Sequence, residues 1–483
     1  MLLHDLPATA EPAARALTFG DEHWSFARLT AEIDRVATAV TVRTDAGDRV
    51  GLVGRNRLAY VAALYGIPAA GRIAVPLNHR LAPAEIAAQA EYAGTTVVIG
   101  DRGDDGLDGA VPWAEWSTEV AASPPSALRG GPAPDDPAWI LFTSGTTGRA
   151  KGAVLTHRSL LAAVEGANAA RPVADDDVYG FCFSLCHVAA YNVFCLHAAG
   201  RPVVITEGFD PAELARVGER EPVTTVSLAP TMLAMLLDHL RDDAGAGRNP
   251  FATLRQLAYG ASSMAPELLR RGAETLGVGF AQGYGMTELS GNAVFLDAEA
   301  HRSALTDRPH LLRAAGKPSP VVKVRIAGDG EILVRGPQVM AGYWDDPEAT
   351  AATIVNGWLH TGDFGEIDAE GYLYVVDRAK DIVVTGGENV SSREVEEVLA
   401  DHPGVATVAV IGVPDERWGE AVCAVIVPVP SAEPSLEDLV AFTRGRLGGF
   451  KQPRRLVLVS GLPVNAAGKV LKRELRAEVT ADG

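Results

Sequence analysis

Hydrophobic positions in the first hundred residues switch between a helical period and short continuous apolar runs. Apolar residues recur every three to four positions in residues 27–40 and 60–70, which is typical of helices that bury one face. Residues 50–53 and 73–77 are short apolar runs, which indicate buried strands. Helices that alternate with strands in this way predict a layered α/β fold.

Two segments rich in glycine, proline and aspartate interrupt this alternation. Such residues favour turns, so we expect residues 101–136 to form a surface excursion and residues 245–250 to form a second loop. Between them, residues 139–142 are again a continuous apolar run. This run predicts a buried strand directly after the first excursion.

The pattern changes again near Lys380. Before it, residues 368–371 predict a turn and residues 372–376 predict a strand. After it, Ser391 and Glu394 have the spacing of a capping box, in which each side chain bonds the other residue's backbone N–H at a helix start. A new structural region therefore begins close to this position.

The rest of the chain is long enough for a second, smaller domain. Residues 405–411 and 421–427 predict strands, and residues 436–447 predict a helix. We therefore expect a large layered α/β N-terminal domain of residues 1–379 and a small α+β C-terminal domain of residues 380–483.

Composition and charge exclude several classes of protein. A chain of 483 residues should form at least two domains. Its net charge of −18 argues against a general nucleic-acid binder, because phosphate contacts need a basic face, and against adsorption to anionic membranes. We find neither an apolar run of about 18 residues, as a spanning helix needs, nor a secretory signal, so we expect a cytoplasmic protein without a membrane span.

The four cysteines are a candidate metal site that the spacing does not favour. Cys182, Cys186 and Cys195 lie close together, and histidines stand nearby. The flanking residues are apolar, however, and the spacings match no zinc pattern. We expect all four thiols, including Cys423, to be buried and to act as small hydrophobic groups.

A loop of hydroxyls and glycines follows the strand at residues 139–142 and ends in Lys151. Glycines let backbone N–H groups turn toward an anion, and the lysine adds a positive charge, as a polyphosphate site requires. The loop is not the common phosphate loop, because Ala150 stands where that pattern has its second glycine and Gly152 follows the lysine. A flexible surface loop is the alternative.

Two further motifs suit a nucleotide. Tyr284 stands between glycines and can stack on a base, while Thr287 and Glu288 can reach a phosphate and a hard cation. A strand-to-helix turn explains that motif equally well. Asp363 stands at a tight turn and can accept two hydrogen bonds from a ribose diol, although an ordinary surface turn is the alternative.

Two charged strings complete the series. Residues 377–381 contain Arg378 and Lys380, and residues 465–469 end in Lys469. A charged string is ordinarily a solvated surface. Their place after the three other motifs favours a shared function instead.

The run S-G-T-T-G-x-x-K-G at residues 144–152 resembles the phosphate loop of the adenylate-forming superfamily of acyl-CoA synthetases, adenylation domains and luciferases. The other four motifs follow in the order of that superfamily, between residues 139 and 473. The chain is therefore identified as a member. Residues 386–390 are similar to the acyl-CoA ligase branch, and the resemblance implies that the small domain is mobile and swings about a hinge at Lys380.

The resemblance implies an ATP-dependent ligase. A carboxylate attacks the α-phosphate of Mg·ATP to give an acyl-adenylate and pyrophosphate, and the thiol of CoA then expels AMP. ATP, Mg²⁺ and CoA are thus the implied cofactor and co-substrates. The small domain would reorient between the two half-reactions.

Each motif residue inherits a role from this resemblance. The β- and γ-phosphates would be held by Thr143, Ser144, Gly145, Thr146, Thr147, Gly148 and Lys151. Adenine would lie between Tyr284 and the segment Gly260, Ala261 and Ser262. Thr287 would touch the α-phosphate, Glu288 would bind Mg²⁺, and Asp363 with Arg378 would fix the ribose.

The resemblance also assigns residues of the small domain. Lys469 would stabilise charge in the adenylation transition state and leave the site for the second half-reaction, so its loss should mainly damage adenylation. Backbone at Gly386 and Gly387 would line the pantetheine tunnel. Lys451, with the neighbouring Arg454 and Arg455, would supply the basic patch that CoA needs.

The sequence specifies the carboxylic acid substrate less closely than it specifies the nucleotide. His187 would lie near the substrate carboxylate, although a lone histidine in an apolar run is usually structural. No aspartate lies between Asp177 and Phe209, which weakens an amino-acid substrate. The pocket candidates are mostly small or apolar and include no residue that could pair with a second carboxylate. We therefore expect a fatty, alicyclic, terpenoid-like or aryl acid and not a malonate-like diacid. These candidates are His187, Ala189, Ala190, Tyr191, Ser227, Tyr259, Gly260, Gly291 and Asn292.

Two departures from the family pattern leave the thiol acceptor open. Ala150 replaces a common proline, and residues 391–393 replace a common Tyr-Pro-Ala near the CoA tunnel. The acceptor could therefore be an acyl carrier protein. The same motifs would also suit a chain that runs only one half-reaction, or a non-enzymatic nucleotide-binding protein.

Overall fold

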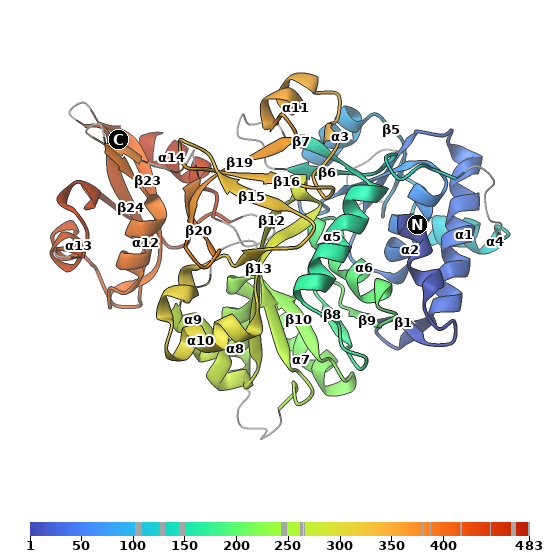
Figure 1. Ribbon diagram of the computed structural model, residues 1–483, viewed down its shortest axis with the longest axis horizontal. Coiled ribbons are helices and arrows are strands. Elements are labelled where there is room, and N and C mark those ends of the chain that lie inside the picture. The colour runs from blue at the N-terminus through green and yellow to red at the C-terminus, as the bar shows by residue number, and fades with distance from the viewer. Residues whose placement is uncertain are drawn as a thin grey trace. The chain divides into compact units, whose positions relative to one another are not determined.

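Helices and strands alternate along most of the chain in the computed structural model (Figure 1). The structure describes residues 1–101, 109–125, 131–143, 150–242, 249–260, 264, 266–378, 381, 383–385, 388–415, 418–444, 446–464 and 470–481. It divides into a large unit, Met1–Val324 with Val334–Leu359, and a small unit, Arg325–Leu333 with His360–Gly483. The predicted boundary at residues 379 and 380 concerns the hinge and stays a prediction.

The large unit contains a mixed nine-stranded sheet. Its strands are β1 (Arg15–Phe19), β2 (Glu22–Ser25), β8 (Tyr179–Phe181), β9 (Val203–Ile205), β10 (Thr225–Leu228), β11 (Gln256–Tyr259), β12 (Gly279–Met286), β13 (Gly291–Leu296) and β14 (Lys317–Pro318). They lie in the order β14-β13-β12-β11-β10-β8-β9-β1-β2. The run from β12 to β1 is parallel, and antiparallel strands close both edges.

A second sheet of the large unit has six strands. They are β3 (Arg49–Val53), β4 (Ile73–Leu77), β5 (Thr95–Ile99), β6 (Pro137–Thr143), β7 (Lys151–Thr156) and β17 (Gly342–Tyr343), in the order β17-β7-β6-β4-β3-β5. The strand predicted at residues 139–142 is therefore confirmed as the centre of β6. It forms a hairpin with β7, in which Thr143 lies opposite Lys151.

The helices of the large unit cover these sheets. They are α1 (Phe26–Arg43), α2 (Leu58–Ala69), α3 (Pro83–Ala93), α4 (Trp113–Ala122), α5 (His157–Ala170), α6 (Tyr191–Ala198), α7 (Pro211–Arg220), α8 (Pro230–Asp242), α9 (Pro266–Leu276), α10 (Ala298–Thr306) and α11 (Pro347–Thr353). The predicted helices at residues 27–40 and 60–70 and the predicted strands at 50–53 and 73–77 are confirmed as α1, α2, β3 and β4. No helix among the described residues is long and apolar enough to cross a membrane.

A proline inside α2 helps to join this helix to β6. Pro68 lacks a backbone N–H, so the carbonyl of Leu64 has no partner within the helix. The indole Nε1 of Trp139 donates a hydrogen bond to that carbonyl at 3.1 Å. The buried Trp139 thus satisfies the group that the proline leaves open.

The excursion predicted at residues 101–136 contains a helix that the prediction missed. In α4, Trp113, Trp116 and Val120 follow one helical face and are buried. The Trp113 Nε1 donates to the Val53 carbonyl at 2.6 Å, which fixes the helix beside β3. Apolar burial outweighs the turn-forming residues on either side. The second predicted loop falls largely on residues 243–248, outside the described residues.

The positions at which the chain passes between the two units, after residues 324, 333 and 359, fall within strands of a five-stranded sheet. Its strands are β15 (Lys323–Ile326), β16 (Glu331–Arg335), β18 (Ile354–Val355), β19 (Trp358–Ile367) and β20 (Leu373–Arg378). The order is β15-β16-β19-β18, and β20 pairs with β19. The strand predicted at residues 372–376 is thus confirmed as part of β20.

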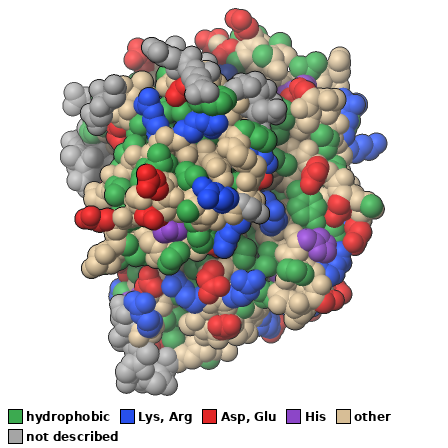
Figure 2. Space-filling model, turned by 90° about the vertical axis from the view of Figure 1, so that its left-hand side faces the viewer, with side chains coloured by type: hydrophobic (Ala, Val, Ile, Leu, Met, Phe, Trp, Pro, Cys, Tyr) green, Lys and Arg blue, Asp and Glu red, His purple; other side chains and the backbone are tan. Residues whose placement is uncertain are grey.

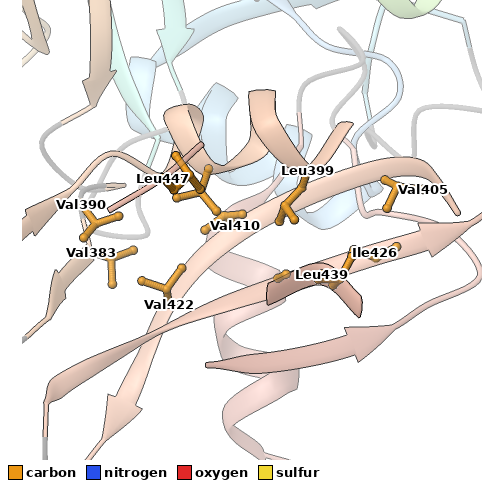
Figure 3. Packing of buried hydrophobic residues seen from close by; sticks show 11 residues of the cluster. Val383, Val390, Leu399, Val405, Val410, Val422, Ile426, Leu439 and Leu447 are labelled. Carbon is orange, nitrogen blue, oxygen red and sulfur yellow. The ribbon is translucent and has the colours of Figure 1, made fainter. Parts of the chain in front are cut away.

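The small unit is built on a sheet whose central strands are buried on both faces. Its strands are β21 (Val383–Thr385), β22 (Glu388–Val390), β23 (Val405–Asp415), β24 (Gly419–Pro428) and β25 (Arg455–Leu458), and its helices are α12 (Ser392–Ala400), α13 (Leu436–Thr443) and α14 (Lys472–Ala481). Val410, Val422 and Ile426 pack with Leu399 of α12 and Leu439 of α13 (Figure 3). On the opposite face, alternate residues such as Ile411 and Val425 pack with Leu475 of α14.

The predicted capping box at α12 is only half formed. The Ser391 Oγ accepts a hydrogen bond from the Glu394 N–H at 3.2 Å, as predicted. The Glu394 carboxylate instead forms an ion pair with the Lys451 Nζ, 2.6 Å away. A nearby cation therefore takes the group that would have completed the box. The strands predicted at residues 405–411 and 421–427 are confirmed, whereas the last predicted helix ends at Thr443.

Candidate active site

A buried carboxylate follows the end of β12. Glu288 lies in the 3₁₀ turn η5 (Thr287–Leu289), directly after Met286, and is only 8% exposed. Ser290 closes the turn in a left-handed conformation with φ of 57°, and its Oγ donates to the Ser159 Oγ of α5 at 2.9 Å. The turn that presents Thr287 and Glu288 is thus anchored to a helix.

Tyr343 of β17 holds the Glu288 side chain. Its Oη donates a hydrogen bond to the Glu288 Oε1 at 2.9 Å, and the Met340 N–H donates to the Glu288 carbonyl at 2.9 Å. Burial, reinforced by the negative charge of Glu288, raises the pKa of Tyr343. The phenol therefore stays protonated and remains a donor to the carboxylate.

The same tyrosine ring contacts Lys151. The Lys151 Nζ lies 4.9 Å from the centre of the Tyr343 ring, within the range of a cation–π interaction. β17 pairs with β7 so that Tyr343 lies opposite Ala153 and its ring comes close to the start of β7. Among the described residues, no carboxylate forms an ion pair with Lys151. Lys151, Tyr343 and Glu288 form one group, which we call the Tyr343 group.

Sequence reasoning found two members of this group and missed Tyr343. The tyrosine lies 55 residues after Glu288, and only its place in Gly342-Tyr343-Trp344, an aromatic pair after a glycine, could have drawn attention to it. Thr143 lies opposite Lys151 in the β6–β7 hairpin. The predicted phosphate-binding residues Ser144, Gly145, Thr146, Thr147 and Gly148 lie between them, outside the described residues.

The glycines around Tyr284 serve strand packing. A Cβ at Gly285 would overlap the carbonyl of Gly291 on β13, and a Cβ at Gly260 would lie 2.9 Å from the Gly283 carbonyl oxygen. Glycine therefore lets β11, β12 and β13 approach closely, which fixes the position of Tyr284 at the carboxyl end of β12. Ala261 and Ser262, predicted beside adenine, lie outside the described residues.

His187 is a half-buried histidine whose inner nitrogen has no partner. Its Nε2 is buried and forms no hydrogen bond with any described residue. Burial, together with the charges of Arg80 and His79, lowers the pKa of His187 to about 4. The imidazole is therefore neutral near pH 7. It directly precedes the 3₁₀ turn η3 (Val188–Ala190) and α6.

The structure separates two of the predicted pocket residues. Ser227 lies in register with Ala258, so Tyr259 points to the opposite face of the sheet. There the Tyr259 Oη lies 3.1 Å from the Gln282 Oε1 and 2.9 Å from the His301 Nε2. Tyr191, by contrast, packs against Gly291, so these two predicted pocket residues are neighbours.

A basic residue that sequence reasoning missed lies beside Tyr191. Arg171 follows α5, and its Nη2 donates to the Asn192 Oδ1 at 3.2 Å. Its Cζ lies 5.5 Å from the centre of the Phe295 ring. The predicted pocket residues contain no cation, but the helix that precedes them supplies one.

In the small unit, Asp363 lies within the strand β19. It is 3% exposed, and its N–H donates to the Thr361 Oγ1 at 3.1 Å. Gly362 has a positive φ of 69°, and its N–H donates to the Glu331 Oε1 at 2.9 Å. Asp363 lies opposite Arg378 in the β19–β20 ladder, so the predicted ribose pair is adjacent in the backbone.

The predicted CoA patch is partly neutralised. Lys451 is bound by Glu394, and Arg454 places its Cζ 4.3 Å from the centre of the Trp418 ring. On the face shown in Figure 2, Lys and Arg side chains are interspersed with Asp and Glu side chains. The predicted residues Gly386, Gly387 and Lys469, and the predicted hinge Lys380, lie outside the described residues.

The four cysteines form neither a disulfide nor a metal group within the described residues. All four cysteines are buried and free, as predicted. Within the described ranges, no group of three or more His, Cys, Asp and Glu residues could hold a metal ion. Glu288 could bind Mg²⁺ without such a group, because this ion is often bound by one or two carboxylates together with substrate phosphates.

Comparison with known families decides the identity of this arrangement. The model of the AMP-binding enzyme matches residues 6–344, and the model of the AMP-binding enzyme C-terminal domain matches residues 394–469. The chain belongs to the AMP-binding enzyme family. The predicted superfamily and fold class are confirmed.

Relatives cover almost the whole chain. A feruloyl-CoA synthase from Amycolatopsis sp is 36% identical, over 97% of this chain and 96% of the relative. The fatty acid–[acyl-carrier-protein] ligase ScoC from Streptomyces coeruleorubidus is 35% identical, over 98% and 95%. The structure of the O-succinylbenzoate CoA synthetase MenE from Bacillus subtilis with ATP and magnesium has a TM-score of 0.85 and 28% identity, over 98% of both chains.

This member of the AMP-binding enzyme family is an AMP-forming acyl-CoA ligase. It converts a carboxylic acid to an acyl-CoA thioester through an acyl-adenylate and uses ATP, Mg²⁺ and CoA.

Proposed function

We propose that the Tyr343 group is the centre of the adenylation site and that the acid is hydrophobic: fatty, alicyclic or aryl. The observation that carries this proposal is the contact of one half-buried tyrosine with both Glu288 and Lys151. A carboxylate for a hard cation and a lysine for phosphate oxygens are thereby held side by side at the carboxyl end of β12. Ligands of α/β sheets bind at this end of parallel strands.

In this proposal, the large unit binds the triphosphate. Lys151 and the loop from Thr143 to Gly148 hold the β- and γ-phosphates, and Thr287 donates to the α-phosphate. Glu288 binds Mg²⁺, which supplies Lewis-acid stabilisation of phosphate charge when it is bound. Tyr343 fixes the Glu288 carboxylate in one orientation before the nucleotide arrives, so less ordering is needed on binding.

Adenine and ribose complete the nucleotide site. Tyr284 stacks on adenine opposite the segment Gly260, Ala261 and Ser262. Asp363 accepts hydrogen bonds from the ribose hydroxyls, and Arg378 lies beside it. A hydrogen bond from the neighbouring Gly362 N–H to Glu331 supports this role, because it fixes the backbone beside Asp363.

His187 binds near the acid carboxylate. Because its pKa is lowered to about 4, the ring is neutral at physiological pH. A neutral imidazole can donate a hydrogen bond to the carboxylate from one nitrogen. It does not form an ion pair, which would make the carboxylate a weaker nucleophile. The carboxylate oxygen then attacks the α-phosphorus, and the bond from this phosphorus to the β-phosphate oxygen breaks.

The small unit supplies the residues that differ between the half-reactions. Lys469 stabilises negative charge during adenylation. For thioesterification, Gly386 and Gly387 line the pantetheine tunnel and Lys451 binds a CoA phosphate. The sulfur forms a bond to the acyl carbon, the bond from that carbon to the AMP oxygen breaks, and the thiol proton is lost to solvent. We place the enzyme in the cytoplasm, where ATP and CoA are available and free thiols stay reduced.

A carrier-protein thiol is the second candidate acceptor. The similarity to ScoC favours it, since that relative is a fatty acid–[acyl-carrier-protein] ligase. The ion pair between Lys451 and Glu394 also supports it, because a CoA phosphate would have to displace Glu394.

Product analysis tests the proposal. Purified protein, Mg·ATP and a panel of fatty, aryl and polycyclic acids are incubated with CoA, with an acyl carrier protein or with neither, and the products are measured by mass spectrometry. Acyl-CoA that forms only with ATP is expected. Thioester that forms only with the carrier protein would favour the second acceptor, and adenylate without any thioester would contradict both.

A further inference from the structure

One face of the nine-stranded sheet carries small side chains at its centre. Ser227 of β10 lies in register with Ala258 of β11, and Ala258 with Ala281 of β12, so the three side chains point to the same face. Tyr179 of β8 points there as well, since it lies opposite Thr225, two positions before Ser227. Small residues at this place project little from the sheet, and on the same face the Asn292 side chain lies over Gly283.

Residues from α5 and α6 lie over that face. Phe295 of β13 shares the face through its pairing with Gly283, and the Arg171 guanidinium lies over the Phe295 ring at 5.5 Å. Tyr191, the first residue of α6, packs its ring on Gly291, where a Cβ would lie 3.0 Å from the ring. Arg171, Tyr179 and Tyr191 therefore surround the same small-residue region, and we call them the donor cluster.

Each member of the donor cluster has a buried donor without a close acceptor. The Tyr179 Oη, the Tyr191 Oη and the Arg171 Nε have no acceptor at hydrogen-bond distance within the described part of the chain, although the Ser227 side chain lies beside Tyr179 and Asn292 lies beside Tyr191, and each lowers the pKa of the phenol that it contacts. The tyrosines are only 4% and 2% exposed. No described carboxylate pairs with Arg171, whose Nη2 bonds the amide oxygen of Asn192.

These donors stay protonated. Burial raises the pKa of Tyr191 to about 12 and also raises that of Tyr179, so both phenols carry their protons at every physiological pH. A buried donor without an acceptor is destabilising, and native structures contain few of them. Three such donors around one region suggest that a ligand supplies the missing acceptor.

We propose that the donor cluster recognises an oxygen at the end of the substrate acid that is remote from its reacting carboxylate. This inference rests on the proposed function, in which His187 lies near that carboxylate. His187 and Tyr191 belong to one short segment, since η3 alone separates them. The preferred substrates are hydrophobic acids with a distal hydroxyl or carbonyl oxygen, and plain hydrocarbon acids are poorer.

Arg171 also has an ordinary structural role to consider. It follows the C-terminus of α5, where a cation is favourable, and it bonds Asn192. That role predicts that its replacement lowers stability but leaves the preference among acids unchanged. The two roles are therefore separable by experiment.

The test compares acids that differ in one oxygen. Wild-type enzyme and the variants Tyr191→Phe, Tyr179→Phe and Arg171→Gln are assayed with cinnamate and 4-hydroxycinnamate, and with octanoate and 7-oxooctanoate. We expect wild-type kcat/KM to favour the oxygen-bearing acid of a pair by tenfold or more. In Tyr191→Phe this preference should fall toward parity, because kcat/KM falls more for the oxygen-bearing acid than for the plain acid.

A matched control is available on the same helix. Arg158 lies in α5, is half exposed, and pairs with Asp135, so Arg158→Gln should keep the wild-type preference. Equal use of both acids by wild-type enzyme, or equal losses for both acids in Tyr191→Phe, would overturn the inference.

A binding measurement separates this inference from the proposed function. The shift in melting temperature caused by each acid is measured for wild type and Tyr191→Phe, with no ATP or CoA present. A larger shift with the oxygen-bearing acid that disappears in Tyr191→Phe supports the donor cluster even if no thioester forms. Equal shifts with both acids contradict it even if the enzyme is an active ligase.

Discussion

Two lysines predicted to bind phosphate stand in opposite surroundings. Lys151 of the large unit lies over the ring of Tyr343 and has no carboxylate partner among the described residues, whereas Lys451 of the small unit is bound by both oxygens of Glu394. An aromatic ring holds a cation without cancelling its charge, but an ion pair largely cancels it. The proposed nucleotide site is therefore ready for its anion, while the proposed CoA patch must first give up an internal partner.

Lys469 of the small unit should contribute strongly to the rate of one half-reaction only, which is adenylation. Lys469→Ala is expected to lower the rate of adenylation by about 10²–10³-fold, the usual effect of removing one group that stabilises transition-state charge. The rate of thioester formation from a preformed acyl-adenylate should change less than threefold. Single-turnover assays of each half-reaction measure both rates.

Arg473→Ala is the control for this change, because it removes an exposed cation four residues further along. It should leave both half-reactions intact. Equal damage to both half-reactions in Lys469→Ala would contradict a role confined to adenylation.

Tyr343 tests whether the large-unit site is held in advance. Tyr343→Phe keeps the ring beneath Lys151 but removes the hydrogen bond to Glu288. A hydrogen bond to a charged group is worth about 1.5–3 kcal/mol, so adenylation should slow by roughly 10- to 100-fold. The Mg²⁺ concentration for half-maximal rate should also rise, as a titration of initial rate against Mg²⁺ will show.

Tyr374 provides the matched control, since its Oη also donates to a carboxylate, that of Asp368, at 3.2 Å. Tyr374→Phe should not change the Mg²⁺ titration. If Tyr343→Phe lowers the rate without moving the Mg²⁺ midpoint, the tyrosine does not position a magnesium ligand.

The ion pair in the small unit predicts effects of opposite sign. Lys451→Gln should raise the KM for CoA, whereas Glu394→Gln should lower it by roughly two- to fivefold, because a partly exposed ion pair is worth only about 0.2–1 kcal/mol. The KM for ATP should stay constant in both. Steady-state kinetics with CoA as the varied substrate measure these changes.

Glu397→Gln breaks a comparable pair on the same helix, that with Arg393 at 3.1 Å, and should leave the KM for CoA unchanged. An unchanged KM in both Lys451→Gln and Glu394→Gln would show that the pair only stabilises the fold.

Local pattern predicted most of the fold, and long-range contacts account for what it missed. The period of apolar residues located α1, α2, β3 and β4, since each buries a face that the chain itself specifies. It missed α4, whose burial depends on the distant Val53 carbonyl. Of the site, the motifs named Lys151 and Glu288, but Tyr343 reaches Glu288 only through the pairing of β17 with β7.

Register limits the prediction of a pocket in the same way. Ser227 and Tyr259 lie near the carboxyl ends of neighbouring strands in the nine-stranded sheet, and only the in-register pairing of Ser227 with Ala258 shows that they point to opposite faces. Arg171 likewise lies 21 residues before Asn192 in a segment with no motif. Sequence alone specifies which residues suit a chemistry, but the strand pairing decides which of them meet.

The last expected effect concerns acid stability and again separates the two units. His157, His187, His197 and His301 all belong to the large unit, and burial lowers the pKa of each to about 4. The unfolded chain takes up these protons near pH 6.5, but the folded unit resists them until about pH 4. Stability should therefore fall as pH drops from 6.5 toward 4 and should be unaffected above pH 6.5.

Each such histidine adds about 1.4 kcal/mol per pH unit to that dependence, so His301→Gln should reduce the slope by about one proton. Urea unfolding followed by tryptophan fluorescence at several pH values measures the slope. Six of the seven tryptophans belong to the large unit, so the signal reports mainly on it. The exposed His310 is the control, since His310→Gln should leave the slope unchanged. A slope equal to that of wild type in His301→Gln would mean that this buried ring takes up its proton equally in both states.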